Sequence, residues 1–171
     1  MSEGTSLLVL GLGNVLLEDD GVGAIAVQRL LEEYEVPESV RVLDGGTLGL
    51  SLLHYVTDAE RLILVDAVRA NGAAGSLVRL DGDDVAPAVA TRLSPHQVGV
   101  SDLLESARWL DRLPSEVVLL GVVPQSIELN FGLTPPVQDA LSGLVDRVVA
   151  EAHDLGFEFR KRSDRPIEGH L

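Results

Sequence analysis

Short apolar runs alternating with longer amphipathic runs are the feature that most limits how this chain can fold. The short runs are rich in Val, Leu and Ile, as buried strands are, and cover residues 6–10, 40–43, 61–65, 76–80 and 117–123. The longer runs repeat apolar residues every three or four positions, as helices packed on a sheet do, and cover residues 21–34, 48–56, 95–110 and 135–155. This order predicts an α/β fold with three layers, α/β/α.

Helical segments separate most of the predicted strands, which favours a mostly parallel sheet. Only residues 67–75 separate the third strand from the fourth, and this stretch holds two glycines and no helical period. We therefore expect a mixed five-stranded sheet, with the fourth strand antiparallel at or near an edge. The length of 171 residues fits a single α/β domain over residues 1–159, followed by a charged, flexible tail over residues 160–171.

The chain is acidic and has no cysteine. It contains 27 Asp and Glu against 13 Lys and Arg, so its formal net charge is −14 at pH 7, which argues against nucleic acid or an anionic membrane as a partner. Without cysteine there are no disulfides or thiolate ligands, and a metal ion would need His, Asp or Glu. The first residues do not resemble a signal peptide, and no apolar run is long enough to span a membrane, so we expect a cytoplasmic protein.

The loop after the first predicted strand reads GLGNVLLEDDGVG, residues 11–23. It does not fit the dinucleotide-binding pattern, because the third glycine of that pattern would fall at Leu16. Its three consecutive acids would repel a phosphate, whereas carboxylates before a helix are well placed to hold a cation. The alternative is a glycine-rich turn in which Asp20 only caps the following helix.

Two further residues are candidate ligands, and the first of them stands where a ligand site of an α/β sheet would form. Asp66 ends the third strand, where a charge is costly unless it is solvated or paired. His96 lies in the first turn of a predicted helix, where the helix dipole favours the neutral imidazole; the alternative is an exposed surface histidine. Together with Asp20 they would offer two carboxylates and one imidazole, a set that suits Ni, Zn, Fe or Mn.

Five motifs, in this order, resemble those of the [NiFe]-hydrogenase maturation endopeptidases: GLGNVLLEDDGVG, LDGGT, LILVDAV, SPHQVG and GVVPQSIELNFGLTP. The resemblance extends from about residue 7 to about residue 156. It implies that Asp20, Asp66 and His96 bind the metal and that Asp44, in LDGGT, is a catalytic or supporting carboxylate. Asp19 and Glu18 are then expected to shape the loop, and no role is assigned to the NFGLTP segment.

The resemblance also implies an activity and a partner. The protein would remove the C-terminal extension from a hydrogenase large-subunit precursor after nickel insertion, with the nickel in the precursor serving as the recognition element. Asp20 or Asp44 would act as the general base, and the protease itself would bind metal weakly or not at all at rest. Two alternatives remain: a non-proteolytic nickel-binding or metallochaperone module, and a small-molecule-binding α/β domain.

Overall fold

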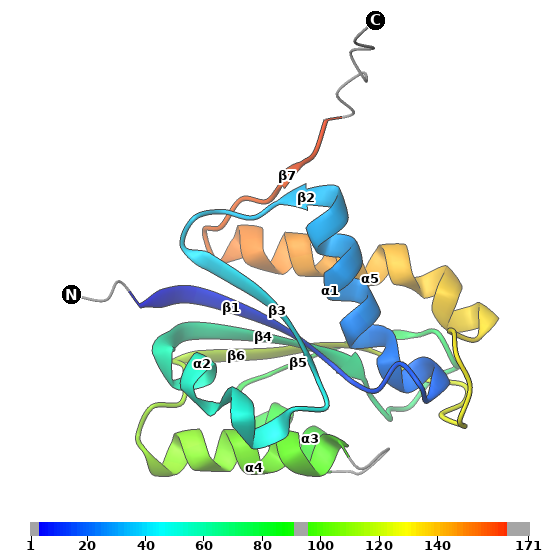
Figure 1. Cartoon of the computed structure of the whole chain (residues 1–171), viewed down its shortest axis with the longest axis horizontal. Helices are drawn as coiled ribbons and strands as arrows, with labels where there is room; N and C mark the ends of the chain where they lie inside the picture. Colours follow the sequence, from blue (N-terminus) through cyan, green and yellow to red (C-terminus); the bar gives the residue numbers. More distant parts are fainter. Residues whose placement is uncertain (1–3, 91–95, 164–171) are drawn as a thin grey trace, which may run out of the picture.

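The chain has the predicted alternation of strands and helices (Figure 1). A computed structural model describes residues 4–90 and 96–163, without the side chains of residues 96–98. The main sheet consists of β1 (Thr5–Leu12), β3 (Val40–Gly46), β4 (Ala59–Ala67), β5 (Leu77–Asp81) and β6 (Glu116–Val122). The longer helices are α1 (Val22–Glu33), α4 (His96–Trp109) and α5 (Pro135–Asp154), and shorter ones are α2 (Leu53–Asp58) and α3 (Val85–Ala90).

The strand order in this sheet is β3-β1-β4-β6-β5. β1 pairs in parallel with β3 and β4, and β4 pairs in parallel with β6. β5 pairs antiparallel with β6 at the edge, so the predicted mixed sheet and the place of its antiparallel strand are confirmed. The four parallel strands end at one edge of the sheet, where Gly11 lies opposite both Asp44 and Val65, and Asp66 lies opposite Gly121.

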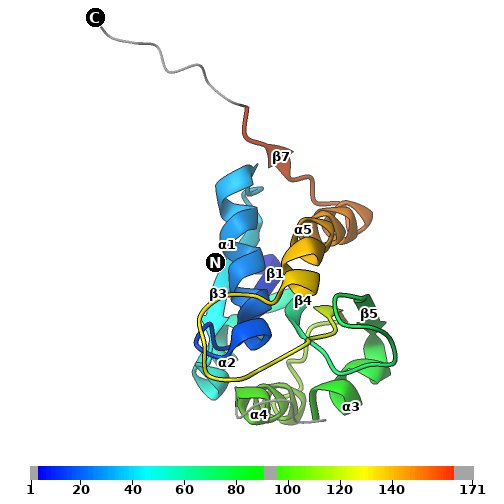
Figure 2. The same ribbon diagram turned by 90° about the vertical axis from the view of Figure 1, so that its right-hand side faces the viewer.

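Each face of the sheet is covered by helices, which confirms the three layers. Successive residues of β1 point to opposite faces: Leu7 and Val9 pack with α1 and α5, whereas Leu8 and Leu10 pack with α2, α3 and α4. Figure 2 shows α1 and α5 on one side of the strands and α3 and α4 on the other. No helix within the described residues is long and apolar enough to cross a membrane.

Several short elements were not predicted. Pro87 lies inside α3, and its presence removes the usual signature of a helix. Three 3₁₀ turns precede helices, namely η1 (Glu18–Gly21), η2 (Gly49–Leu52) and η3 (Gly82–Asp84), and η2 lies within the helical run predicted over residues 48–56. The first two lie in the loops that follow β1 and β3.

The ends of α5 agree with the sequence. Thr134 is the N-cap residue, followed by proline, and Gly156, with φ of +93°, donates its N–H to the carbonyl of His153. After the helix, β7 (Arg160–Lys161) pairs antiparallel with β2 (Tyr34–Glu35). The segment expected as a tail therefore starts with residues hydrogen-bonded to the domain, and residues 164–171 lie outside the described part of the chain.

Candidate functional site

The glycines in the loop after β1 allow the backbone to pack closely at the edge where the parallel strands end. Gly13 has φ of +118°, and a Cβ atom there would lie 1.8 Å from the carbonyl oxygen of Asp20. A Cβ atom on Gly23, in the first turn of α1, would lie 2.0 Å from the carbonyl oxygen of Val65. Side chains at these positions would push the loop away from the sheet. The glycines thus bring η1 and the start of α1 against β1 and β4.

Asp20 is fully buried in η1, where its Oδ2 accepts a hydrogen bond from the N–H of Asn14 at 2.9 Å. The N-cap residue of α1 is Gly21, so the structure does not support the alternative that Asp20 is merely the cap of this helix. Burying a carboxylate is costly unless hydrogen bonds or a cation compensate for lost water. The loop therefore holds a buried carboxyl group at the strand ends that is not the N-cap of α1.

Asp66, near the end of β4, is the second acid at this edge. It is 5% exposed, and its Oδ1 accepts the N–H of Ala67 at 2.8 Å. η1 lies against β4, so the segments that carry Asp20 and Asp66 are in contact. The structure therefore brings two of the three predicted ligand residues to one edge of the sheet, both shielded from bulk water.

His96 is the first residue of α4, but its side chain lies outside the described residues. The backbone of this helix is placed by a close contact three residues later, because a Cβ atom on Gly49 would lie 3.2 Å from the Cα of Gly99. Gly49 begins η2 in the loop after β3, so α4 starts beside the edge where the parallel strands end. Among the described side chains, no group of three His, Asp or Glu residues could hold a metal ion.

Asp44 lies at the same edge, on β3, but is exposed to solvent. Its Oδ2 accepts a hydrogen bond from Gln28 Nε2 on α1 at 2.9 Å, and its Oδ1 accepts the N–H of Gly46 at 3.0 Å. Asp44 therefore connects the end of β3 to α1. An exposed carboxylate at the rim of the strand ends has room to approach a bound molecule.

Asp19 has a structural role that sequence reasoning described only as shaping the loop. It is fully buried, and four hydrogen bonds reach it from the segment between β6 and α5. Oδ2 accepts the N–H groups of Gln125 at 2.8 Å and Ser126 at 3.1 Å and the hydroxyl of Thr134 at 2.6 Å. Oδ1 accepts the N–H of Thr134 at 2.8 Å. Asp19 thus fastens the loop after β1 to the loop after β6.

The sequence assigned no role to the segment that Asp19 binds. Thr134 occupies the N-cap position of α5 but makes no side-chain cap bond, and its hydroxyl donates to Asp19. The three consecutive acids of residues 18–20 could have indicated this contact. An acid buried in this loop needs hydrogen-bond donors, and the loop after the last parallel strand could supply them.

A second link joins the same two loops. The N–H of Asn130 donates to the carbonyl of Leu16 at 2.9 Å, and the N–H of Glu18 donates to the carbonyl of Asn130 at 3.0 Å. In Figure 2 the loop between β6 and α5 swings out past the first turn of α1 before it returns to α5. The edge that carries Asp20 and Asp66 is therefore bordered by two loops held together by side-chain and backbone hydrogen bonds.

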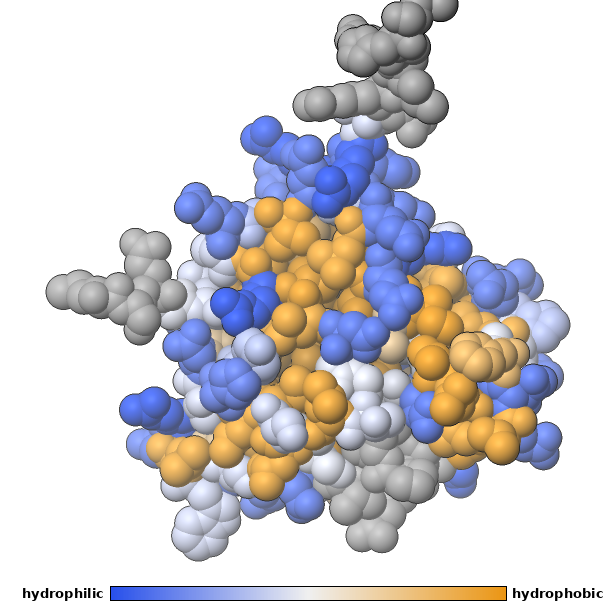
Figure 3. All heavy atoms as spheres, viewed as in Figure 1, coloured by the Kyte–Doolittle hydropathy of each residue, from blue (hydrophilic) through white to orange (hydrophobic). Residues whose placement is uncertain are grey.

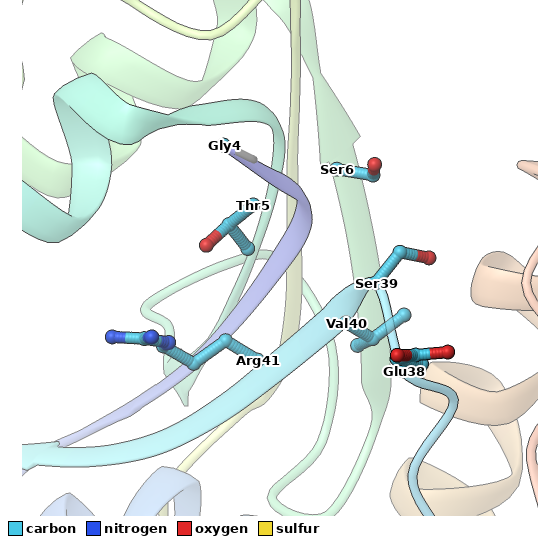
Figure 4. A pocket seen from close by; sticks show the side chains of 7 residues that line it. All are labelled: Gly4, Thr5, Ser6, Glu38, Ser39, Val40 and Arg41. Atoms are coloured by element: carbon cyan, nitrogen blue, oxygen red, sulfur yellow. The ribbon is translucent and has the colours of Figure 1, made fainter. Parts of the chain in front are cut away.

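The opposite edge of the sheet has a hollow but no comparable chemistry. An open cavity of about 820 Å³ lies at the starts of β1 and β3 (Figure 4), lined by Gly4, Thr5, Ser6, Glu38, Ser39, Val40 and Arg41. Figure 4 shows Arg41 and Thr5 pointing away from Ser6 and Ser39, so the polar groups do not converge on one point. Ligand sites of open α/β sheets form at the carboxyl ends of the strands. Asp20 and Asp66 lie at that edge, and this cavity lies at the other.

Comparisons with known proteins agree on one family. Residues 25–151 match the model of a family described as hydrogenase maturation protease. The chain is 37% identical over 153 residues to the hydrogenase 2 maturation protease of Escherichia coli K12, covering 89% of this chain and 93% of that one. It is 42% identical over 148 residues to the hydrogenase expression/formation protein HupD of Rhodobacter capsulatus, covering 85% of this chain and 69% of that one.

A solved structure has the same fold over almost its whole length. The hydrogenase maturating endopeptidase HybD from E. coli superposes with a TM-score of 0.88 at 37% sequence identity, covering 93% of this chain and 99% of that chain. The resemblance that the five motifs indicated is therefore confirmed by sequence and by structure.

Proposed function

The chain belongs to the hydrogenase maturation protease family, and we propose that it removes the C-terminal extension from a [NiFe]-hydrogenase large-subunit precursor after nickel has been inserted. The nickel already held by the precursor would be the recognition element. The observation that carries this proposal is the pair of buried carboxylates, Asp20 and Asp66, on contacting segments at one edge of the sheet.

The donor set fits a nickel ion that arrives with the substrate. Asp20 and Asp66 supply carboxylates, and His96 would supply an imidazole, a set of ligands that nickel accepts. The chain has no thiolate of its own, so its resting affinity for metal would be low and it would not strip nickel from the product. Only a loaded precursor would offer the ion that these three residues bind, which makes nickel insertion the condition for cleavage.

The peptide bond would be placed for cleavage by this contact. The metal would polarise the scissile carbonyl or lower the pKa of an attacking water. Asp20 is held by the N–H of Asn14 and is shielded from water, whereas Asp44 is exposed and oriented by Gln28 and Gly46. Both remain candidates for the general base, Asp20 because it lies in the ligand set and Asp44 because solvent and substrate can reach it.

Substitution of Asp44 separates these two assignments. If Asp44 is the base, Asp44→Asn should lower kcat by about 10²- to 10⁴-fold with little change in KM, which single-turnover cleavage would measure. If Asp20 is the base, Asp44→Asn should keep kcat within about tenfold of the wild-type value. Gln28→Leu serves as a control, since it removes the hydrogen bond from α1 but leaves the Asp44 carboxylate in place.

The experiment that tests the function compares nickel-loaded and nickel-free cognate precursor, with intact mass spectrometry reporting loss of a C-terminal peptide. We expect cleavage of the loaded precursor alone, and its loss in His96→Ala, with Asp139→Asn on the exposed face of α5 as a matched control. Equal cleavage of both forms would contradict recognition through nickel. Binding of loaded precursor without cleavage of either form would favour a non-proteolytic nickel-binding module.

A further inference from the structure

Three large apolar side chains are exposed on the two loops that Asp19 holds together. Leu16 is 45% exposed, Leu129 is 81% exposed and Phe131 is 74% exposed. We call these three residues the apolar lip. Figure 3 shows apolar surface on the right-hand side of the molecule, where η1 and the loop after β6 lie. Folding does not require these side chains to be apolar, because the surrounding water would accommodate polar ones equally well.

The lip is held in place although its side chains are uncovered. Asn130, between Leu129 and Phe131, is hydrogen-bonded on both sides to the loop that carries Leu16, through its N–H at 2.9 Å and its carbonyl at 3.0 Å. Four bonds to Asp19 hold the same segment near its two ends, at Gln125, Ser126 and Thr134. An apolar surface on a fixed backbone loses little conformational entropy when a partner binds, which favours association.

The lip is also connected to the candidate site. The N–H of Leu16 donates to Asn14 Oδ1 at 2.9 Å, and the N–H of Asn14 donates to Asp20 Oδ2 at 2.9 Å. Asn14 thus lies between the lip and a proposed nickel ligand, with one hydrogen bond to each. A polypeptide that brings its nickel to Asp20 would have neighbouring residues within reach of the lip.

The charge on these two loops indicates what kind of segment fits them. Residues 11–23 and 123–134 contain Glu18, Asp19, Asp20 and Glu128, and no Lys, Arg or His. Glu128 is exposed next to Leu129. Exposed apolar side chains on loops whose charged residues are all acidic are complementary to a segment that carries apolar residues beside basic ones.

We infer that the apolar lip docks a segment of the precursor polypeptide in which apolar side chains stand next to Lys or Arg. This inference rests on the proposed function, because it takes the precursor as the bound protein. The lip supplies affinity and orientation apart from the nickel contact, and the acids beside it favour a basic segment. It adds to recognition through nickel a contact that depends on the polypeptide.

The test is steady-state cleavage of nickel-loaded precursor by Leu129→Ser/Phe131→Ser. We expect KM to rise at least about tenfold with kcat within about twofold, because the lip does not touch the reacting atoms. Trp109→Ser is the matched control: Trp109 is 86% exposed at the far end of α4 from His96, and its replacement should leave KM unchanged. Equal melting temperatures of all proteins would show that the fold is retained.

A second variant tests the charge. Glu128→Gln should raise KM by about two- to fivefold at low ionic strength and should weaken the dependence of KM on salt, because exposed charges are screened. Its control is Asp139→Asn, an exposed acid on α5 that should not change the salt dependence.

The outcomes distinguish this inference from the proposed function. If wild-type protein cleaves the loaded precursor and the double variant has the same KM and the same affinity in a binding assay, the lip is not a docking surface, while the proposed function stands. If the double variant loses kcat but not affinity for the precursor, the lip acts in the reaction and the docking role is wrong. If the wild-type protein cleaves no precursor, the proposed function and this inference both fall.

Discussion

Two neighbouring acids of one loop, Asp19 and Asp20, have different surroundings. Around Asp19, four donors from the loop after β6 satisfy both carboxylate oxygens, so this region is a fastening between loops. Asp20 accepts a hydrogen bond from Asn14 in its own loop, and its segment lies against the strand that carries Asp66. Both acids are fully buried, so burial alone does not distinguish a structural carboxylate from a functional one. We expect the surroundings of each acid to decide which role it has.

The largest effect on stability should come from Asp19→Asn. The NH₂ that replaces one carboxylate oxygen cannot accept a hydrogen bond, so at least one buried donor from Gln125, Ser126 or Thr134 would lose its partner. We expect the free energy of unfolding to fall by about 3 kcal/mol, measured by denaturation in urea. Asp139→Asn, in which an exposed acid is replaced, should change it by less than about 0.5 kcal/mol. An unchanged stability for Asp19→Asn would contradict the role of the fastening.

Asp20→Asn should have the opposite effect, with a large loss of activity and a small change in stability. We expect kcat/KM for the loaded precursor to fall more than about a hundredfold. A residue that only supports a metal ligand costs at most about a hundredfold when it is replaced, so a larger loss indicates a ligand. The free energy of unfolding should stay within about 1 kcal/mol of the wild-type value, because the amide oxygen can still accept the N–H of Asn14 and a buried charge is removed. Strong destabilisation with activity retained would place Asp20 in the same class as Asp19.

Thr134→Val measures how much one of the four hydrogen bonds to Asp19 contributes to stability. The variant keeps the N–H bond to Asp19 and loses the hydroxyl bond of 2.6 Å. Since hydrogen bonds to charged groups contribute about 1.5–3 kcal/mol, we expect a loss of about 2 kcal/mol in the free energy of unfolding. Thr134→Ser, which keeps a hydroxyl, should lose less than half of that; equal losses would mean that the methyl group matters more than the hydrogen bond.

Asn14→Ala should have the smallest effect. It removes the acceptor for the N–H of Leu16 and leaves the backbone N–H that binds Asp20. We expect a loss of about 1 kcal/mol in the free energy of unfolding and a change of less than about tenfold in kcat/KM. A hundredfold loss of activity would show that the side chain of Asn14 has a direct part in the reaction.

The sequence predicted the layers, the antiparallel edge strand and the edge of the sheet that carries Asp20 and Asp66. These follow from local patterns, because apolar periodicity marks strands and helices and an acid at the end of an apolar run marks a loop. The fastening at Asp19 could not be predicted in the same way. Its partners lie 106 to 115 residues away in the chain, and three of its four donors are backbone N–H groups, which leave no trace in residue type.

Some short elements could not be predicted from the sequence for a related reason. Pro87 lies inside α3, and a proline argues against a helix in a sequence. The pairing of β7 with β2 involves two residues in each strand, which are too few to form a pattern. The exposure of Leu129 and Phe131 was equally hard to foresee, because apolar residues in a loop are as compatible with burial as with exposure. Only the arrangement of the two loops reveals that both side chains face solvent.

The most direct measurement of the nickel contact is the affinity of the protein for the uncleaved precursor, with and without nickel, in wild-type protein and in His96→Ala. We expect wild-type protein to bind the loaded precursor at least about a hundredfold more tightly than the empty one, corresponding to about 2.7 kcal/mol. In His96→Ala this ratio should fall close to one, while Asp139→Asn should keep it. A ratio near one in the wild-type protein, or an unchanged ratio in His96→Ala, would contradict recognition of the precursor through its nickel.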